Sequence, residues 1–377
     1  MNELVLISVS GEDKPGITAT ISKLLGSLDV DILDVGQSVI HNHLSLGILV
    51  NVPDILADVL EALSEQSVRL GVQVRFTPVS EESYEQWVGL QGASRYILTL
   101  LARRIKASHI SAVCEIIAAS GLNIDNITRL SGRVPLHEVG DISKACVEFS
   151  LRGEPGESFR EQLLAVCADL NIDVAVQEDG IYRRNRRLIA FDMDSTLIKT
   201  EVIDELAVQA GVGAEVADIT SRTMAGELDF SMSLAKRVEL LRGLPVSALA
   251  KVADRLPLME GAEHLFKTLN HLGYKTAILS GGFSYFGQLL QAKLGVDYVY
   301  ANELEIAGGV LTGRVLSPIV DADRKADLLK QLADKEGISL QQTIAVGDGA
   351  NDLAMLDIAG LGIAFHAKPL VRESAGH

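Results

Sequence analysis

Two aspartates, Asp192 and Asp194, stand two residues apart, directly after the apolar run 188–191 and before Ser195 and Thr196. The apolar run predicts a short buried strand, and the two hydroxyl residues predict the turn at its end. Residues i and i+2 of an extended chain point to the same side, so the two carboxylates would either repel each other or share a cation. A carboxylate can be the nucleophile of a phosphoryl transfer, and the usual cation for that chemistry is Mg²⁺. A pair of this kind standing alone is usually only a solvated turn.

Three further segments carry groups suited to the same chemistry. Ser280 begins a Ser-Gly-Gly sequence at the end of a second apolar run, and a hydroxyl followed by unhindered glycine amides can hold phosphate oxygens. Lys325 stands just before a helical stretch and offers a positive charge. Asp348 and Asp352 stand four residues apart after a third apolar run. Taken singly, these segments would be a plain turn, a surface charge and an acidic turn.

The three apolar runs end in these polar loops, and helical segments separate them. That alternation is typical of a doubly wound α/β sheet, in which ligands bind at the carboxyl ends of the strands. We therefore expect residues 185–377 to form one α/β domain. Such a domain would bring the two aspartate pairs, Ser280 and Lys325 to the same edge of its sheet.

Together the four segments resemble, in order and spacing, the four motifs of the haloacid dehalogenase-like phosphatase superfamily. The resemblance covers about residues 185–370 and implies a Rossmann-like doubly wound parallel sheet with a small helical cap. About 80 residues separate the first two motifs, and this insertion fits a cap at about residues 200–258. Its composition, rich in Ala, Leu, Arg and Glu, predicts helices at 203–206, 224–230 and 233–244.

Within the insertion, four residues match the pattern of the phosphoserine phosphatases, a family of this superfamily. The resemblance implies that Glu201 meets the ammonium group of the substrate and that Arg237 meets its carboxylate. Met224 and Phe230 would wall the pocket. A zwitterionic substrate needs one anion and one fixed cation, and an Arg side chain can grip a carboxylate with two parallel hydrogen bonds. The alternative is an ordinary amphipathic cap helix with Arg237 on its surface.

The same resemblance implies a Mg²⁺ site and a reaction. The ion would be held by Asp192, Asp348 and the backbone carbonyl of Asp194, and Asp352 would position a water molecule bound to it. The reaction would be hydrolysis of O-phospho-L-serine to L-serine and phosphate, the last step of serine biosynthesis. Asp192 would attack phosphorus to give an aspartyl-phosphate. Asp194 would protonate the departing serine oxygen and then take a proton from the hydrolytic water.

The resemblance also assigns residues to the substrate's phosphoryl group. Lys325, Ser280 and the Gly281 amide would spread its charge during the transfer. Asn351, which lies between the last two aspartates, would be a further substrate-binding residue. The cap would close over the site and keep bulk water out during the first step.

The N-terminal half contains two copies of one pattern. Residues 1–80 and 95–180 each show strands and amphipathic helices in the order βαββαβ, which predicts two ferredoxin-like units. The loop 131–143 is longer than its counterpart in the first copy. Residues 78–95 begin with Pro and contain several charges and Gly, so we interpret them as the linker between the two units.

The first unit resembles an ACT domain, because Asp13-Lys-Pro-Gly16 precedes its first helix. The resemblance implies side-by-side pairing in a homodimer and binding of a small amino acid. Asp13, Gly16 and Ile17 are the candidate regulatory residues, since this turn leads into a helix N-terminus, which favours a carboxylate. In the second unit residues 102–107 replace that turn, so ligand binding there stays open. For both units the alternative is a dimerisation platform without a ligand.

Composition narrows the class of protein. The 377 residues include 34 basic and 50 acidic side chains, a net charge of −16, and such a surface repels nucleic acid and anionic membranes. No apolar run approaches the ~20 residues of a membrane helix, and the N-terminus shows no signal pattern. Three cysteines lack metal-ligand spacing and are interpreted as reduced core residues of a cytoplasmic protein: Cys114, Cys146 and Cys167.

Two other functions remain open from the sequence. One is a phosphatase or phosphotransferase of the same superfamily that acts on a different small phosphomonoester. The pairing of Glu201 with Arg237 disfavours it, because an uncharged sugar phosphate offers neither group a partner. The other is a non-catalytic amino-acid sensor with an inactive phosphatase domain. The intact set Asp192, Asp194, Lys325 and Asp348 disfavours that function.

Overall fold

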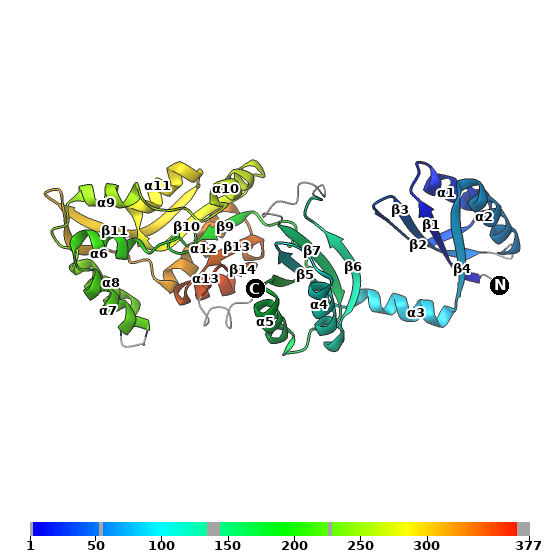
Figure 1. The fold of residues 1–377 in the computed structure, drawn as a ribbon, viewed down its shortest axis with the longest axis horizontal. Helices are drawn as coiled ribbons and strands as arrows, with labels where there is room; N and C mark the ends of the chain where they lie inside the picture. The colour runs from blue at the N-terminus through cyan, green and yellow to red at the C-terminus, as the bar shows by residue number, and fades with distance from the viewer. Residues whose placement is uncertain (1–2, 53–55, 134–143, 225–227, 368–377) are drawn as a thin grey trace. The chain divides into compact units, whose positions relative to one another are not determined.

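The computed structural model describes residues 3–52, 56–133, 144–224 and 228–367. The chain divides into two compact units, residues 1–93 and 94–377 (Figure 1). The described residues of these units form three separate β-sheets. Among the described residues no helix is long and apolar enough to cross a membrane.

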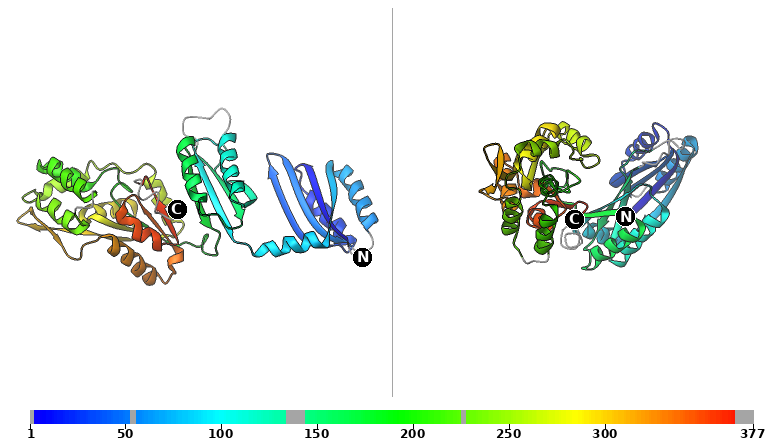
Figure 2. Two further views of the ribbon diagram at one scale, coloured as in Figure 1. Left: turned by 90° about the horizontal axis from the view of Figure 1, so that it is seen from below. Right: turned by 60° about the vertical axis from the view of Figure 1, so that its left-hand side comes forward.

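The first unit contains a four-stranded antiparallel sheet with the strand order β2-β3-β1-β4. Alternate residues of β3, from Leu44 to Val52, are buried and form a core with Ile21 of α1 and Leu63 of α2. Both helices therefore cover the same face of the sheet (Figure 2). The predicted βαββαβ order is confirmed, and its elements are β1 Glu3–Glu12, α1 Ile17–Ser27, β2 Asp31–Ile40, β3 His43–Val52, α2 Leu56–Leu70 and β4 Val72–Val79.

The second unit begins with the same arrangement, which confirms the internal repeat. Its strand order, β6-β7-β5-β8, corresponds strand for strand to that of the first sheet. Part of the long loop expected at 131–143, residues 134–143, lies outside the described residues. The elements are β5 Arg95–Ala102, α4 Ala107–Ala119, β6 Asn123–Arg129, β7 Ala145–Arg152, α5 Phe159–Leu170 and β8 Asp173–Glu178.

The segment interpreted as the linker contains a helix, α3 (Glu81–Gly89), followed by the 3₁₀ turn η1 (Leu90–Gly92). The Ser80 side chain accepts a hydrogen bond from the Ser83 N–H at 3.1 Å, and two glutamates occupy the first turn. This is the N-terminal pattern of a helix. Pro78, the first residue of the expected linker, belongs to the end of β4.

A six-stranded, mostly parallel sheet follows, with the order β12-β11-β10-β9-β13-β14. Only β12 runs antiparallel to its neighbour. The strands of this sheet and the helices between them, apart from the cap, are β9 Leu188–Phe191, α10 Ala262–His271, β10 Lys275–Phe283, α11 Ser284–Leu294, β11 Tyr298–Ala307, β12 Val310–Leu316, α12 Ala322–Glu336, η3 Leu340–Gln342, β13 Thr343–Gly347, η4 Ala350–Asp352, α13 Leu353–Ile358 and β14 Leu361–Ala364.

Helices cover both faces of this sheet, as Figure 1 shows. Phe191 of β9 packs with Phe266 of α10 and Phe286 of α11 on one face. Its strand neighbour Ala190 packs with Leu329 of α12 on the other face. The central strands are therefore apolar on both sides, which is typical of parallel sheets. The expected doubly wound α/β fold is confirmed.

The described residues of the cap, between β9 and α10, form four helices, α6 Val202–Ala210, α7 Gly213–Met224, α8 Phe230–Glu239 and α9 Val246–Ala253. The predicted helix at 224–230 was wrong, because Asp229 lies outside the helix and caps α8 by accepting a hydrogen bond from the Met232 N–H at 2.7 Å. Residues 225–227 lie outside the described residues. The sequence interpretation missed α7, which contains Thr and β-branched residues of weak helix propensity. It also extended the α8 helix past Glu239.

Candidate active site

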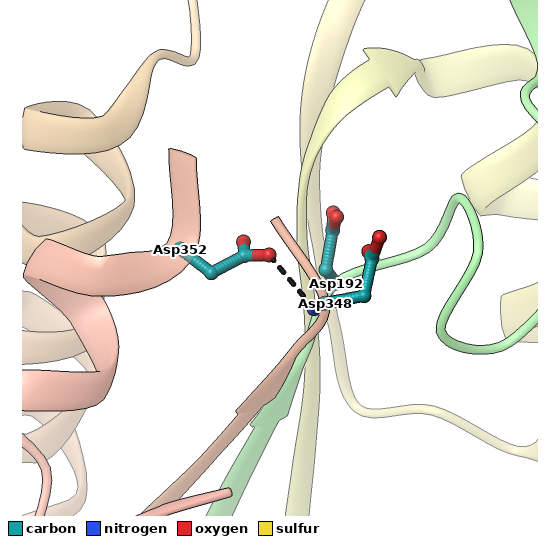
Figure 3. Close-up of side chains that lie close together, drawn as sticks. All are labelled: Asp192, Asp348 and Asp352. Atoms are coloured by element: carbon teal, nitrogen blue, oxygen red, sulfur yellow. Dashed lines mark hydrogen bonds between the residues drawn. The ribbon is translucent and has the colours of Figure 1, made fainter. Parts of the chain in front are cut away.

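Three buried aspartates meet at the carboxyl ends of two neighbouring strands (Figure 3). Asp192 follows β9 and Asp348 follows β13, and the Asp192 N–H donates to the Val346 carbonyl at 2.9 Å. Figure 3 shows the carboxylates of Asp192 and Asp348 extending in the same direction, with Asp352 approaching from the start of a helix. One ligand atom from each of the three lies within 4.8 Å of the others.

Backbone hydrogen bonds fix the position of Asp352. Its Oδ2 accepts from the N–H groups of Asp348 and Gly349 at 3.1 and 3.0 Å. Gly347 permits this approach, because a Cβ atom at that position would overlap the Asp352 carboxyl group. The first glycine of the Gly-Asp-Gly sequence therefore allows the end of β13 and the turn that follows it to lie in close contact.

Lys325 reaches the same cluster from the first turn of α12. Its Nζ lies 2.8 Å from Asp192 Oδ1 and 2.8 Å from Asp352 Oδ1, and its side chain is fully buried. Burial alone would lower the pKa of Lys325, but Asp192 and Asp352 outweigh that effect and raise it. The ammonium group is therefore charged at every pH at which the protein would work.

The two aspartates of the first motif have raised pKa values. Burial and the carboxylate of Asp352 raise the pKa of Asp192 to about 7, against the opposing charge of Lys325. Burial, Glu201 and Asp192 raise the pKa of Asp194 well above its usual range. Both side chains are less than a tenth exposed. The buried surroundings therefore favour the protonated form of Asp194, while the pKa of Asp192 lies near neutral pH.

The carboxylates of Asp192, Asp348 and Asp352 fit a hard divalent cation. Mg²⁺ binds oxygen ligands and commonly uses one or two carboxylates together with water and substrate phosphate. The mutual repulsion that raises the pKa of Asp192 is what a cation would relieve. The donor set therefore matches the expected metal in chemical type.

Asp194 is held between the cap and Gly282, a residue near the end of β10. Its Oδ1 accepts a hydrogen bond from the Val202 N–H, the first residue of α6, at 2.8 Å. A Cβ atom at Gly282 would overlap Asp194 Oδ2 and would lie 2.7 Å from Met193 Cε. Ser195 turns the chain here with a positive φ of 57°. A glycine at position 282 is thus required by the close approach of the Asp194 carboxyl group.

Ser280 lies fully buried at the end of β10, where the strand bulges. Its Oγ accepts a hydrogen bond from the Gly282 N–H at 2.9 Å. The hydroxyl proton is therefore left to donate to another acceptor, such as a phosphate oxygen. Phe230 of the cap covers the adjacent Gly281, where a Cβ atom would lie 2.9 Å from its ring.

The cap brings two opposite charges toward the same site. Glu201 precedes α6 and accepts a hydrogen bond from the Ser195 hydroxyl at 3.1 Å. Arg237 lies on α8 and is partly buried, which lowers its pKa, while Glu201, Asp204 and Asp194 raise it. The acidic groups near Asp194 and the Arg237 guanidinium are thus close enough to interact. Met224 ends α7, but its side chain lies outside the described residues.

The remaining expected residues lie as follows. Asn351 lies in the turn η4 and is half-buried beside Gly349, where a Cβ atom would overlap Asn351 Oδ1. In the first unit, Asp13 is exposed and Gly16 precedes α1 with a φ of 95°. The Ile17 side chain is only 2% exposed and belongs to the core, so only its backbone could meet a ligand.

Two polar residues near the site were not among the candidates from the sequence. Thr196 Oγ1 donates to Asp348 Oδ1 at 3.4 Å. Asn302, a fully buried residue of β11, donates from Nδ2 to the Gly281 carbonyl at 2.8 Å. The sequence could have indicated Asn302 only as a polar residue in a strand, two residues before Leu304 and therefore on the same, inward face.

Comparisons with known proteins match three parts of the chain to families. Residues 189–357 match the haloacid dehalogenase-like hydrolases, and residues 3–77 and 94–177 each match the ACT domain. The chain is 41% identical to the phosphoserine phosphatase SerB2 of Mycobacterium tuberculosis over 98% of this chain and 88% of that protein. It is 40% identical to a phosphoserine phosphatase of Streptomyces coelicolor over the same shares.

Solved structures agree with these matches. A haloacid dehalogenase-family hydrolase from Salmonella enterica serovar Typhi aligns with a TM-score of 0.63 and 33% identity, covering 75% of this chain and 93% of that one. A probable phosphoserine phosphatase from Vibrio cholerae, in an unliganded form, aligns with a TM-score of 0.57 and 35% identity. That alignment covers 75% of this chain and 81% of the other.

Proposed function

Because the chain belongs to the phosphoserine phosphatases of the haloacid dehalogenase-like hydrolases, with two ACT domains ahead of the hydrolase domain, we propose that it hydrolyses O-phospho-L-serine to L-serine and phosphate. The observation that carries the proposal is the contact of Lys325 with both Asp192 and Asp352, beneath a cap that carries Glu201 and Arg237. In the cell this reaction would be the last step of serine biosynthesis. We take the domains to be residues 1–80, 95–180 and 185–377, with the cap at about 200–258.

Asp192 is the proposed nucleophile. A carboxylate attacks phosphorus only when ionised, and Lys325 at 2.8 Å stabilises that form against the effect of burial. In-line attack would give an aspartyl-phosphate and release the serine oxygen. The transferring phosphoryl group carries charge on its three outer oxygens, which Lys325, the Ser280 hydroxyl and the Gly281 amide would bind.

Asp194 is the proposed general acid and base. Burial, Glu201 and Asp192 raise its pKa and so favour the protonated acid, and the Val202 N–H donates to Oδ1, which leaves Oδ2 as the oxygen to carry the proton. Oδ2 would donate this proton to the departing serine oxygen. The resulting carboxylate would then accept a proton from the water that hydrolyses the aspartyl-phosphate.

A divalent cation, proposed to be Mg²⁺, would be held by Asp192, Asp348 and the backbone carbonyl of Asp194. When bound, it neutralises charge on the phosphoryl oxygens and on the aspartates. Both oxygens of Asp352 already have partners in the protein: two backbone N–H groups donate to Oδ2, and Lys325 donates to Oδ1. Asp352 is therefore proposed to position a water molecule near the ion and not to bind the ion directly.

The cap residues are proposed to select the substrate. Glu201 would bind the ammonium group of phosphoserine, and Arg237 its carboxylate, since a zwitterion needs both charges. Phe230 would close the pocket over Gly281, and Met224 and Asn351 would complete it. Release of phosphate from phosphoserine, phosphothreonine and a sugar phosphate would test this. We expect phosphoserine to have the highest kcat/KM, and equal values for all three would contradict the selection by Glu201 and Arg237.

For the first ACT domain we propose an amino-acid effector, bound near Asp13, Gly16 and the N-terminus of α1, and pairing of two chains. A helix N-terminus favours a carboxylate, and Gly16 allows close approach of a ligand to the backbone. Coupling between such sites is typically about 1–3 kcal/mol. Calorimetric titration of the full-length protein and of an Asp13→Ala variant with serine and with glycine would test this proposed binding site. Equal binding by both proteins, or none by either, would contradict this location.

A further inference from the structure

Asn302 is a buried polar residue on β11, next to the loop that holds Ser280. Its side chain has no solvent exposure. A polar side chain in an apolar interior is costly unless its hydrogen bonds are made, so buried amides are normally fully paired. The partners of Asn302 therefore indicate its role.

The pairing of β10 with β11 breaks at this point. Leu279 pairs with Tyr300, but the next pair is Phe283 with Asn302. Three residues of β10, 280–282, thus lie between the two pairs, opposite one residue of β11, Ala301. The surplus chain bulges out of the sheet and its backbone groups leave the regular ladder. The Ser-Gly-Gly loop is that bulge, and Asn302 stands at the break.

The Asn302 side chain replaces the missing ladder contact. Its Nδ2 donates to the Gly281 carbonyl at 2.8 Å. That carbonyl belongs to the peptide unit whose N–H, on Gly282, donates to Ser280 Oγ at 2.9 Å. This peptide is therefore held at both ends. Its orientation in turn fixes which way the Ser280 hydroxyl proton is free to point.

The other end of the same amide holds a second segment of the site. Asn302 Oδ1 accepts from the Val320 N–H at 2.8 Å, and Nδ2 lies 3.5 Å from the Val320 carbonyl. Val320 directly precedes Asp321, the residue that caps α12. The Asp321 carbonyl accepts from the Lys325 N–H at 3.0 Å, one turn into the helix that presents the lysine.

We propose that Asn302 is a positioning residue for the transferring phosphoryl group. One amide ties the loop that presents Ser280 to the start of the helix that presents Lys325, so both side chains meet the same phosphate. The role requires a donor toward Gly281 and an acceptor toward Val320, which an amide supplies and a carboxylate of the same shape does not. This inference rests on the proposed function of Ser280 and Lys325.

The test compares full-length wild-type protein with Asn302→Asp. The aspartate keeps the shape but turns an oxygen toward the Gly281 carbonyl, which would displace the loop. We expect kcat to fall about 10²-fold, as for a small misplacement of a catalytic group. The fall should be equal for phosphoserine and p-nitrophenyl phosphate, which share only the phosphoryl group. Inhibition by inorganic phosphate should weaken as well.

Asn270→Asp is the matched control. Asn270 also donates from its side-chain amide to backbone carbonyls, those of Leu294 and Gly295, both at 3.2 Å and away from the aspartate cluster. We expect this variant to lower Tm while kcat and phosphate inhibition stay at wild-type values. If Asn302→Asp does not fold, Asn302→Ser, which keeps one donor and one acceptor at shorter reach, takes its place.

A folded Asn302 variant with wild-type kcat and wild-type phosphate inhibition would overturn the proposal, even if its Tm fell. A loss confined to phosphoserine would also overturn it, because that result points to the serine part of the pocket. Failure of wild-type protein to hydrolyse phosphoserine would contradict the proposed function instead. The comparison with p-nitrophenyl phosphate would still decide the role of Asn302.

Discussion

Lys325 Nζ lies 2.8 Å from Asp192 Oδ1, and both side chains are buried. Asp352 lies at the same distance from the same nitrogen, so one cation faces two carboxylates. Asp348 and Asp194 add further acidic groups close by. The site thus has more acidic than basic groups, and a bound cation would reduce the repulsion among them.

Lys325→Met removes the cation and leaves Asp192 and Asp352 facing each other. We expect kcat on phosphoserine to fall about 10²–10³-fold, the usual effect of losing one charge-stabilising donor. Breaking a buried ion pair typically costs about 3–5 kcal/mol, so Tm should fall too. Lys330→Met on the same helix is the control, because Lys330 is half-exposed and pairs only loosely with Asp327 at 3.5 Å. Wild-type kcat in Lys325→Met would contradict the role of this lysine.

Arg237→Ala tests the carboxylate clamp. We expect kcat/KM for phosphoserine to fall far more than for p-nitrophenyl phosphate, since truncating one member of a buried charge pair typically costs about 2–5 kcal/mol. Lys236→Ala, the exposed neighbour on α8, should leave both substrates unaffected. An equal loss for both substrates in Arg237→Ala would show that this residue does not select the serine part.

Gly282→Ala tests the placement of Asp194. The added methyl group would overlap Asp194 Oδ2, so the general acid must move. We expect about a 10²-fold loss of kcat on phosphoserine, whose alkoxide needs a proton on departure. The loss on p-nitrophenyl phosphate, a good leaving group, should be smaller. Gly213→Ala is the control, because a Cβ there meets only Val208 at 3.7 Å. Equal losses on both substrates would contradict the acid role.

The pKa of Asp192, raised to about 7, gives the metal-free protein a defined pH dependence. Between about pH 4 and pH 7 the folded state binds more protons at Asp192 than the unfolded state, so stability from this group falls as pH rises. In EDTA we expect the Tm of wild type to drop over that interval relative to Asp192→Asn. Mg²⁺ should raise the wild-type Tm more at pH 7.5 than at pH 5. An equal Mg²⁺ effect at both pH values would contradict a metal site built on these carboxylates.

The sequence predicted the strand ends well, because each catalytic loop follows an apolar run. A strand that is buried on both faces appears in the sequence as a continuous apolar run, so the first polar residues mark its end. The approach of Asp192 to Asp348 follows from their places after β9 and β13, which are adjacent parallel strands. The burial of Lys325 was not predictable from local pattern, since a lysine before a helix is ordinarily exposed. It depends on two carboxylates that come from distant parts of the chain.

The cap and Asn302 show where local patterns fail. α7 has weak helix formers and is stabilised by packing of Val216 into the core, which a local propensity does not include. Asn302 has no motif around it, because its partners Gly281 and Val320 are about 20 residues away on either side. In the sequence, Asn302 could be recognised only as a polar residue at an inward position of a strand.

Asp192 is the proposed nucleophile of this phosphoserine phosphatase. The most direct measurement is phosphate release from O-phospho-L-serine in Mg²⁺ by wild type and Asp192→Asn, with the fold of both followed by circular dichroism. An amide cannot attack phosphorus, and loss of one buried anion beside Asp352 relieves repulsion, so we expect a folded variant without turnover. A folded Asp192→Asn protein that keeps more than a few per cent of wild-type kcat would contradict the account.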